Sequence, residues 1–319
     1  MRRIWIWLIC AIAFSGHAVA DVFPKRTVTL IVPFAAGGGV DTVARPLAEE
    51  LRKILNHPVI VENRPGAATN LGTEQVAKAD ADGHTLLINL DTVAMYPLLY
   101  SKLKYNFATD LTPVSYVASS PMVLVVTPSL GVNSLGAFLE LAKRKPEKLT
   151  FAAPGLGTPH HLAFELLSYY AAFQVQTVGY RGGGPALNDV IAGHVNVGVF
   201  TLGTALPYIE AGKLTALAVT SEKRSELAKQ IPTLSEQGFS QAQLSNRYVV
   251  MAPAKTPQET IMALHRAIEQ AVARPELIEA VRRQGYDILL TSPAEAKAML
   301  QEEFSRWQPI VRDAKIQVE

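Results

Sequence analysis

The chain has 319 residues, of which 49% are hydrophobic and 18% charged, with a formal net charge of +2. This composition excludes a disordered chain, and the length exceeds that of a usual single core, so two lobes are expected. The sequence also lacks the basic cluster that marks a nucleic-acid-binding protein.

The first twenty residues have the pattern of a removable export signal. Arg2 and Arg3 precede the short apolar run Ile4–Phe14, and Ala18-Val19-Ala20 provides a small-x-small site for cleavage after Ala20. The run is about half of the ~20 residues needed to cross a bilayer, so a membrane anchor is the less favoured alternative. Cleavage would remove Cys10, the only cysteine, and leave 28 basic against 28 acidic residues. We expect a periplasmic mature chain with no disulfide and no membrane insertion.

The next part of the chain alternates apolar β-branched runs with amphipathic runs. We predict strands at Thr27–Pro33, Val59–Glu62 and Thr85–Asn89, separated by helices at Thr42–Leu55 and near Asn70–Ala79. This β-α-β-α-β order predicts a parallel sheet with right-handed crossovers. The following stretch, Leu111–Thr127, holds two apolar runs broken at Ser119-Ser120-Pro121, which we interpret as a candidate hinge.

A second α/β series follows the candidate hinge. Its predicted elements are helices at Leu135–Arg144, Pro159–Tyr170 and Pro185–Ala192 and strands at Leu149–Ala153, Val175–Tyr180, Val195–Phe200 and Leu214–Thr220. The last predicted elements are a strand at Tyr248–Ala252 and helices at Pro257–Ala273, Pro275–Gln284 and Ala294–Asp313. Because these helices have too few strands for a third sheet, we expect them to return to the first lobe. The prediction is an α/β protein with residues 1–20 as signal, 21–121 plus 245–319 as lobe I and 122–244 as lobe II.

Three predicted strand-to-helix junctions are rich in glycine: Pro33–Asp41, Ala153–His161 and Tyr180–Pro185. Glycine permits close backbone approach to a ligand, and a helix start offers unpaired N–H groups that suit an anion. Asp41 and Thr158 are placed to cap the first two helices. Ligands bind at the carboxyl ends of strands in such folds, so we expect the loops to converge on one cleft. Ordinary connecting turns are the alternative.

Several segments together resemble one receptor family. They are PFAAGGGVDTVARPLAEEL, VENRPGAATNLGTEQVAKADADGHTLL, YNFATDLTPVSYVA, APGLGTPHHLAFELL, YRGGGPALNDVIAGHVNV and LTALAVTSEKRS with IPTLSEQGF. This set is similar to the Bug-type receptors of tripartite tricarboxylate transporters. The resemblance implies a type II periplasmic-binding-protein fold whose two hinged lobes close like a Venus flytrap on a small carboxylate, with membrane permease subunits as partners.

The resemblance also implies which residues hold the carboxylate. The residues of the first loop are Phe34, Ala36, Gly37, Gly38 and Asp41, and those of the second are Gly157, Thr158 and His161. Tyr180, Thr201 and Arg247 complete the candidate ligand-binding set.

Three positions depart from the family pattern. Tyr96 precedes Pro97 where the family often has Asn, Thr201 follows the strand phenylalanine in place of Asp, and Arg247 replaces a Trp. Thr201 cannot pair with an ammonium group, which argues against an amino-acid ligand. Arg247 either meets a second carboxylate, favouring a di- or tricarboxylate, or forms a salt bridge at the surface or hinge.

Other functions find less support in the sequence. The spacing of Gly37-Gly38-Gly39 does not match a dinucleotide loop, and no G-x-S-x-G motif provides a nucleophile. His160 and His161 are adjacent on a predicted helix and point apart, so they do not form a chelating pair. We expect a monomer with no catalytic residues, cofactor or metal. A receptor that presents its ligand to a sensor kinase and an exported enzyme using the same cleft remain as alternatives.

Overall fold

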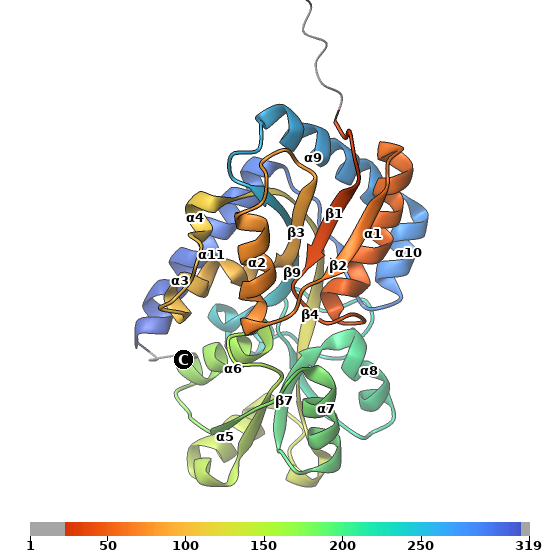
Figure 1. Cartoon of the computed structure of the whole chain (residues 1–319). Helices are drawn as coiled ribbons and strands as arrows, with labels where there is room; N and C mark the ends of the chain where they lie inside the picture. The colour runs from red at the N-terminus through yellow and green to blue at the C-terminus, as the bar shows by residue number, and fades with distance from the viewer. Residues whose placement is uncertain (1–22, 314–319) are drawn as a thin grey trace, which may run out of the picture.

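The computed structural model describes residues 23–313, so the predicted export signal lies outside the described range. Figure 1 shows two lobes, one above the other. Lobe I contains both the first strands and the last helices, whereas lobe II is built from the middle of the chain. Within the described range, no helix combines the length and apolarity needed to cross a membrane.

The sheet of lobe I begins with three parallel strands, which confirms the β-α-β-α-β prediction. Its strands are β1 (Val28–Val32), β2 (Val59–Asn63), β3 (Thr85–Leu90), β9 (Ser245–Pro253), β10 (Asp287–Ile288) and the first part of β4 (Leu111–Val126). Their order is β2-β1-β3-β9-β4, with β9 antiparallel to both neighbours and β10 paired to β4. Strands β1 to β3 therefore run in the same direction as β4.

Strand β4 is continuous for 16 residues, so the two apolar runs on either side of Ser119-Ser120-Pro121 belong to one strand. Residues up to Pro121 pair with β9, and residues from Met122 onward pair with β7 and β8. Pro121, which has no N–H to donate, lies where the strand changes partners. Ser245, the first residue of β9, is its register partner. The chain thus passes from one sheet into the other without leaving the extended conformation.

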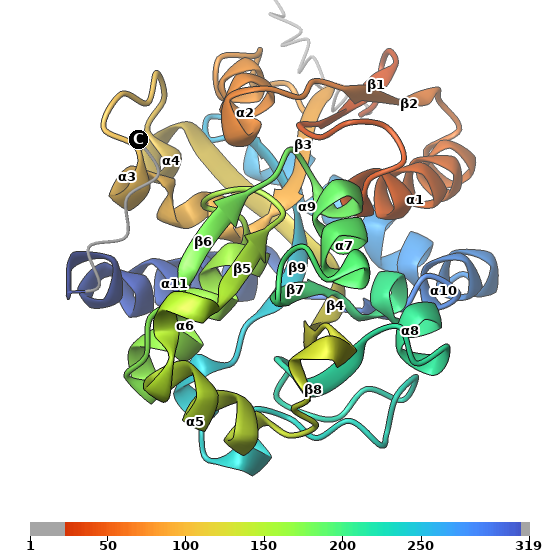
Figure 2. The same cartoon turned by 90° about the horizontal axis from the view of Figure 1, so that it is seen from below.

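The sheet of lobe II is completed by four shorter strands. They are β5 (Thr150–Ala153), β6 (Gln176–Gly179), β7 (Val197–Thr201) and β8 (Thr215–Val219). Helices α5 (Leu135–Arg144) and α6 (Pro159–Ala171) lie on one side of this sheet, and α7 (Gly183–Ala192) and α8 (Leu202–Glu210) lie on the other (Figure 2). Helix α8 is absent from the sequence prediction, and α7 begins two residues before the predicted start at Pro185.

Helices cover both faces of the sheet in lobe I. On one face lie α1 (Gly39–Leu55), α9 (Gln258–Val272) and α10 (Pro275–Arg282); on the other lie α2 (Asn70–Ala77), α3 (Tyr96–Leu99), α4 (Phe107–Asp110) and α11 (Pro293–Asp313). The 3-10 turns are η1 (Ala67–Thr69), η2 (Asp91–Met95), η3 (Pro128–Leu130), η4 (Pro146–Lys148), η5 (Ser235–Gln237) and η6 (Ser240–Ala242).

The buried hydrophobic side chains form three clusters. The one beneath α11 runs through both lobes and joins Trp307 and Tyr116 of lobe I to Phe138 of lobe II. The cluster beneath α1, α9 and α10 stays in lobe I, and that beneath α7 and α8 stays in lobe II.

Candidate functional site

Strand direction brings the predicted loops to the junction of the lobes. Because β4 runs from lobe I into lobe II, the parallel strands β1 to β3 end facing lobe II. Strand β7 is antiparallel to β4, and β5 and β6 are parallel to β7, so these three strands end facing lobe I. The loops after β1, β5 and β6 therefore point from opposite lobes toward the same region.

The loop after β1 is held by a buried carboxylate. Gly37 has φ +78°, and its N–H donates to Oδ2 of Asp41 at 2.8 Å. Gly38 occupies the N-cap position of α1, while Asp41 is the third residue of the helix. The predicted capping role of Asp41 is therefore wrong, because its side chain reaches back beyond the cap to fix the glycine turn.

The Asp41 carboxylate accepts hydrogen bonds from neighbouring groups of lobe I. Arg45 Nε donates to Oδ2 at 2.8 Å, and Asn63 Nδ2 donates to Oδ1 at 2.9 Å and to the Phe34 carbonyl at 3.0 Å. Burial alone would raise the pKa of Asp41, but the hydrogen bonds from Arg45, Gly37 and Asn63 hold this pKa below its usual value. The carboxylate is 2% exposed and stays ionised, so it stabilises the loop.

The loop after β5 repeats this construction in lobe II. Gly157 has φ +76°, and its N–H donates to Nδ1 of His161 at 3.1 Å. Thr158 occupies the N-cap position of α6 as predicted, but its hydroxyl donates to the Gly155 carbonyl at 2.7 Å and caps no amide. His161 is 5% exposed. Asp41 and His161 thus play the same role, because each accepts a hydrogen bond from the glycine N–H four residues before it.

The loop after β6 lies against the loop after β5. Gly182 N–H donates to the Pro154 carbonyl at 2.9 Å, which ties the two loops together. The Tyr180 hydroxyl donates to Asp189 on α7 at 2.6 Å, and burial together with this bond raises the pKa of Tyr180 to about 12. Tyr180 therefore braces α7.

A chain of polar contacts crosses the junction between these loops. Its members, which we call the junction chain, are His160, Thr201, Asn246, Ser120 and Tyr248. Their contacts are His160 Nε2 to Thr201 Oγ1 at 3.2 Å, Asn246 Nδ2 to Thr201 Oγ1 and to Ser120 Oγ at 3.3 Å each, and Ser120 Oγ to Tyr248 Oη at 3.4 Å.

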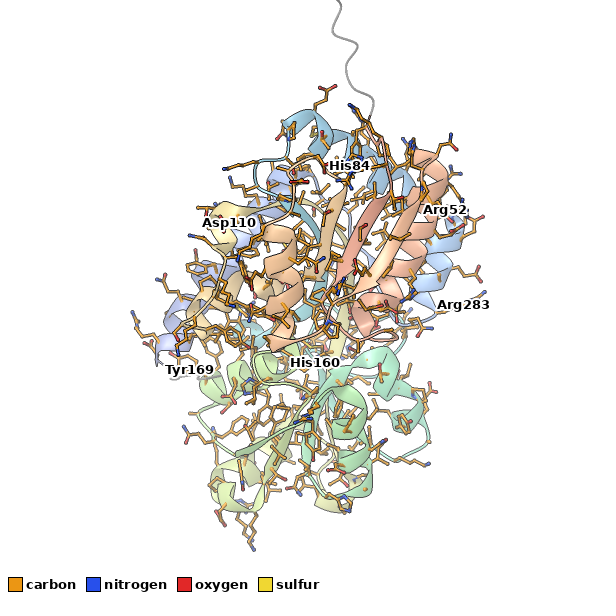
Figure 3. All side chains as sticks on the ribbon, viewed as in Figure 1. Arg52, His84, Asp110, His160, Tyr169 and Arg283 are labelled. Atoms are coloured by element: carbon orange, nitrogen blue, oxygen red, sulfur yellow. The ribbon has the colours of Figure 1, made fainter. Side chains whose placement is uncertain are left out.

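The junction chain connects the starts of α1 and α6. A methyl group at Gly39, the first residue of α1, would lie 3.3 Å from the Tyr248 hydroxyl, and His160 is the second residue of α6. Figure 3 places His160 where the two lobes meet. The ligand-binding set predicted from the sequence includes His161 and leaves out His160, because the order of the two residues does not show which imidazole faces the junction.

Arg247 lies in a buried ion cluster beside the junction. Its Nε pairs with Asp91 at 2.5 Å and its Nη2 with Glu303 at 2.6 Å. Trp307 donates to Glu303 at 2.7 Å. Of the two roles predicted for Arg247, the structure shows the salt bridge. Burial raises the pKa of Asp91 to about 7 although Arg247 opposes this rise.

The junction offers an anion backbone N–H groups from helices of both lobes. Within α1 the first helical bond is Thr42 N–H to Gly38 C=O at 2.9 Å, so the amides of Gly39, Val40 and Asp41 precede it. The first such bond in α6, from Leu162 to Thr158, is also 2.9 Å long. Each helix start contributes about 0.3–1 kcal/mol toward an exposed anion and more when partly buried.

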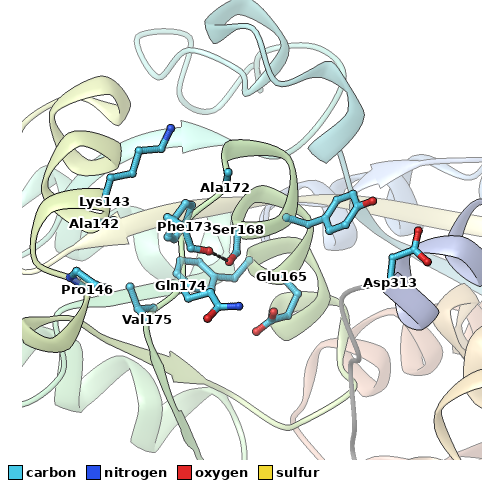
Figure 4. A pocket seen from close by; sticks show the side chains of 12 residues that line it. Ala142, Lys143, Pro146, Glu165, Ser168, Ala172, Phe173, Gln174, Val175 and Asp313 are labelled. Carbon is cyan, nitrogen blue, oxygen red and sulfur yellow. Dashed lines mark hydrogen bonds between the residues drawn. The ribbon is translucent and has the colours of Figure 1, made fainter.

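A separate cavity of about 770 Å³ lies at the other end of α6. Lys143, Glu165, Gln174 and Asp313 are among its lining residues (Figure 4). It is distinct from the loops at the start of this helix. Among residues 23–313, no group of three or more His, Cys, Asp or Glu side chains is placed to hold a metal ion.

Solved structures establish the class of the protein. The chain superimposes on the periplasmic binding protein BugD with a TM-score of 0.82 and 30% identity, covering 92% of this chain and 99% of that one. A Rhodopseudomonas palustris protein with adipate gives a TM-score of 0.84 at 31% identity, over 93% and 99% of the two chains. MatC from the same organism, with bound malate, gives 0.81 at 30% identity, over 91% and 100%. The predicted periplasmic-binding-protein fold is confirmed.

Sequence comparison identifies the family. The model of the tripartite tricarboxylate transporter family receptor matches residues 43–316. BugT from Bordetella pertussis is 36% identical over 318 residues, covering 98% of both chains. The chain belongs to this receptor family. The resemblance noted in the sequence is thereby confirmed.

Proposed function

We propose that this chain is an extracytoplasmic receptor that captures a small organic acid with more than one carboxylate and delivers it to the permease of a tripartite tricarboxylate transporter. The observation that carries the proposal is the pair of matching glycine loops. Gly37 and Gly157 have nearly the same φ, +78° and +76°, and each precedes a helix after a strand that runs toward the other lobe.

In the proposed complex the ligand carboxylate lies between these loops. The backbone of Ala36, Gly37 and Gly38 approaches it from lobe I, and that of Gly157 and Thr158 approaches it from lobe II, with Phe34 beside it. Asp41 and His161 hold the loops through the hydrogen bonds described above. Tyr180 braces the third loop, and Arg247 orders the junction through its ion pairs.

The charge pattern of the junction supports an organic acid as the ligand. Thr201 places a neutral hydroxyl where an ammonium group would need a carboxylate, and Asp41 is already neutralised by Arg45. Two structural relatives contain adipate and malate, which are both dicarboxylates. These observations favour a dicarboxylate over an amino acid.

Ligand capture would proceed by lobe closure. We propose that residues 21–121 with 245–319 form one moving lobe and 122–244 the other, because β4 changes partners at Pro121 and β9 begins at Ser245. A ligand that contacts both lobes stabilises the closed form by its differential affinity for that form. We further propose export to the periplasm, cleavage after Ala20 and a monomeric, non-catalytic protein.

Thermal unfolding of the mature chain with a panel of acids tests the proposal. Malate, adipate and citrate should raise the melting temperature, because a ligand at one hundred times its Kd adds about 2.7 kcal/mol to stability. Glutamate should leave the melting temperature unchanged, because the proposed site has no carboxylate for its ammonium group. A panel that leaves the melting temperature unchanged would contradict the receptor function. Conversion of a bound acid to product would contradict the non-catalytic role.

Gly37→Ala and Gly131→Ala form a matched pair for the site itself. Both glycines have similar positive φ, +78° and +72°, and a methyl group on either meets no atom within 4 Å. The backbone cost is therefore about 1–2 kcal/mol at each position. Only Gly37→Ala should also weaken acid binding, by tenfold or more. Equal affinities in calorimetry would exclude the first loop from the binding site.

A further inference from the structure

We propose that His160 determines ligand specificity by donating a hydrogen bond from a neutral Nδ1–H to a second oxygen acceptor of the bound acid. This inference rests on the proposed function, because it concerns the far end of a ligand anchored by the glycine loops. It is carried by the order of donors and acceptors in the junction chain.

The order begins at the Asn246 amide. This side chain is 1% exposed, and its Nδ2 donates to both Thr201 Oγ1 and Ser120 Oγ at 3.3 Å. The two donor hydrogens of the amide are thereby used. The Asn246 carbonyl oxygen, Oδ1, is buried and has no hydrogen-bond partner among the described residues. Thr201 Oγ1 consequently accepts from Asn246 and must direct its own proton elsewhere.

His160 provides the acceptor for that proton. Its Nε2 lies 3.2 Å from Thr201 Oγ1. Thr201 is the N-cap residue of α8, yet its side chain makes no capping bond, so the hydroxyl is free to turn toward His160. When Nε2 accepts this proton in a neutral imidazole, the ring proton must be on Nδ1. Thr201 and Asn246 are thus positioning residues that fix the tautomer.

The imidazole of His160 stays neutral and keeps a free donor. Burial lowers its pKa to about 4, and no carboxylate of the described residues pairs with it. His161 and His194, in contrast, each lie within 3.4 Å of an acidic side chain. Nδ1 of His160 has no partner among the described residues, and the side chain remains partly exposed. A neutral N–H of this kind donates to carboxylate, hydroxyl or carbonyl oxygen and has no acceptor to meet in an ammonium group.

Matched acids distinguish a specific contact from a general one. Succinate against butanoate and adipate against hexanoate differ only in the second carboxylate, and 6-hydroxyhexanoate replaces it with a hydroxyl. Calorimetry should show that His160→Ala weakens binding of the diacids by about tenfold to a hundredfold and leaves the monoacids unchanged. His160→Asn, whose amide can donate from a similar position, should restore part of the affinity. His194→Ala, at an exposed histidine, is the control.

The pattern of affinity losses in His160→Ala also identifies the acceptor. If adipate and 6-hydroxyhexanoate both lose affinity in His160→Ala, the site reads any oxygen acceptor; if adipate alone loses affinity, it reads a carboxylate. Equal losses for diacids and monoacids would overturn the inference while leaving the receptor function intact. Failure of every acid to bind the wild-type protein would instead overturn the proposed function.

Nitrogen-15 NMR of histidine-labelled protein tests the tautomer directly. The wild-type protein should show His160 as the Nδ1–H form, and Thr201→Val should reduce that preference without changing the signals of His194. A wild-type Nε2–H form would refute the proposed donor order. A merely structural role for Thr201 would leave the His160 tautomer unchanged.

Discussion

Gly203→Ala should push the two lobes apart where the start of α8 meets the backbone of Gln284. Gly203 is the second residue of α8 in lobe II, and a methyl group there would lie 2.2 Å from the carbonyl oxygen of Gln284 in lobe I. An ordinary contact between the methyl group and the carbonyl oxygen would be more than one ångström longer. The carbonyl oxygen belongs to the backbone, so it cannot rotate away as a side chain could. Overpacking of this kind costs about 1–3 kcal/mol. Gly203 does not have positive φ, so the backbone itself tolerates alanine.

Gly136→Ala is the matched control because Gly136 is the second residue of α5 and has open space around it. This change should be neutral or stabilise the protein by up to about 1 kcal/mol through helix propensity. Urea unfolding of both variants measures the difference, and calorimetry with a bound acid measures the effect on lobe closure. If the two variants unfold with the same free energy, the close contact between lobes does not exist in solution.

Three further changes test the charged groups. Asp41→Asn should lower the free energy of unfolding by about 1–2 kcal/mol, because it weakens charge-assisted hydrogen bonds. Since the folded pKa of Asp41 is depressed, the full loss should be seen well above pH 3.8 and should vanish as the pH falls below 3.8. Urea unfolding across this pH range measures the loss. Burial raises the pKa of Asp91 from 3.8 to about 7, so wild-type stability should fall as pH rises from 3.8 to 7, where Asp91 ionises beside Arg247, and Asp91→Asn should flatten that profile. Arg247→Met leaves two buried acids unpaired and should cost about 3–5 kcal/mol in the same assay, whereas Arg283→Met, in an exposed pair, should change nothing measurable.

The sequence predicts most of the fold because periodicity is strong where strands are buried. At β4 the sequence shows two apolar runs broken at Ser119-Ser120-Pro121, although the strand is continuous. In the fold Ser120 is fully buried and bonded to Asn246, and Pro121 lies where the strand changes partners. Helix α8 was missed because LGTALPYIE contains glycine and proline.

The parts of the candidate site that consist of backbone loops were predictable from the sequence. Glycines reveal the loops after β1 and β5, where Gly37 and Gly157 have positive φ. Side-chain orientation was not predictable: nothing local distinguishes His160 from His161. Arg247 meets Asp91, which is 156 residues away, and Glu303, which is 56 residues away, so sequence alone could only offer alternatives for it.

The hydrophobic cluster beneath α11 has a consequence for how the molecule unfolds. Trp307 and Tyr116 in lobe I belong to the same apolar body as Phe138 in lobe II. Neither half can lose its packing without exposing apolar surface of the other, which couples their melting. Scanning calorimetry should record one cooperative peak, with equal calorimetric and van't Hoff enthalpies, although the protein is divided for binding.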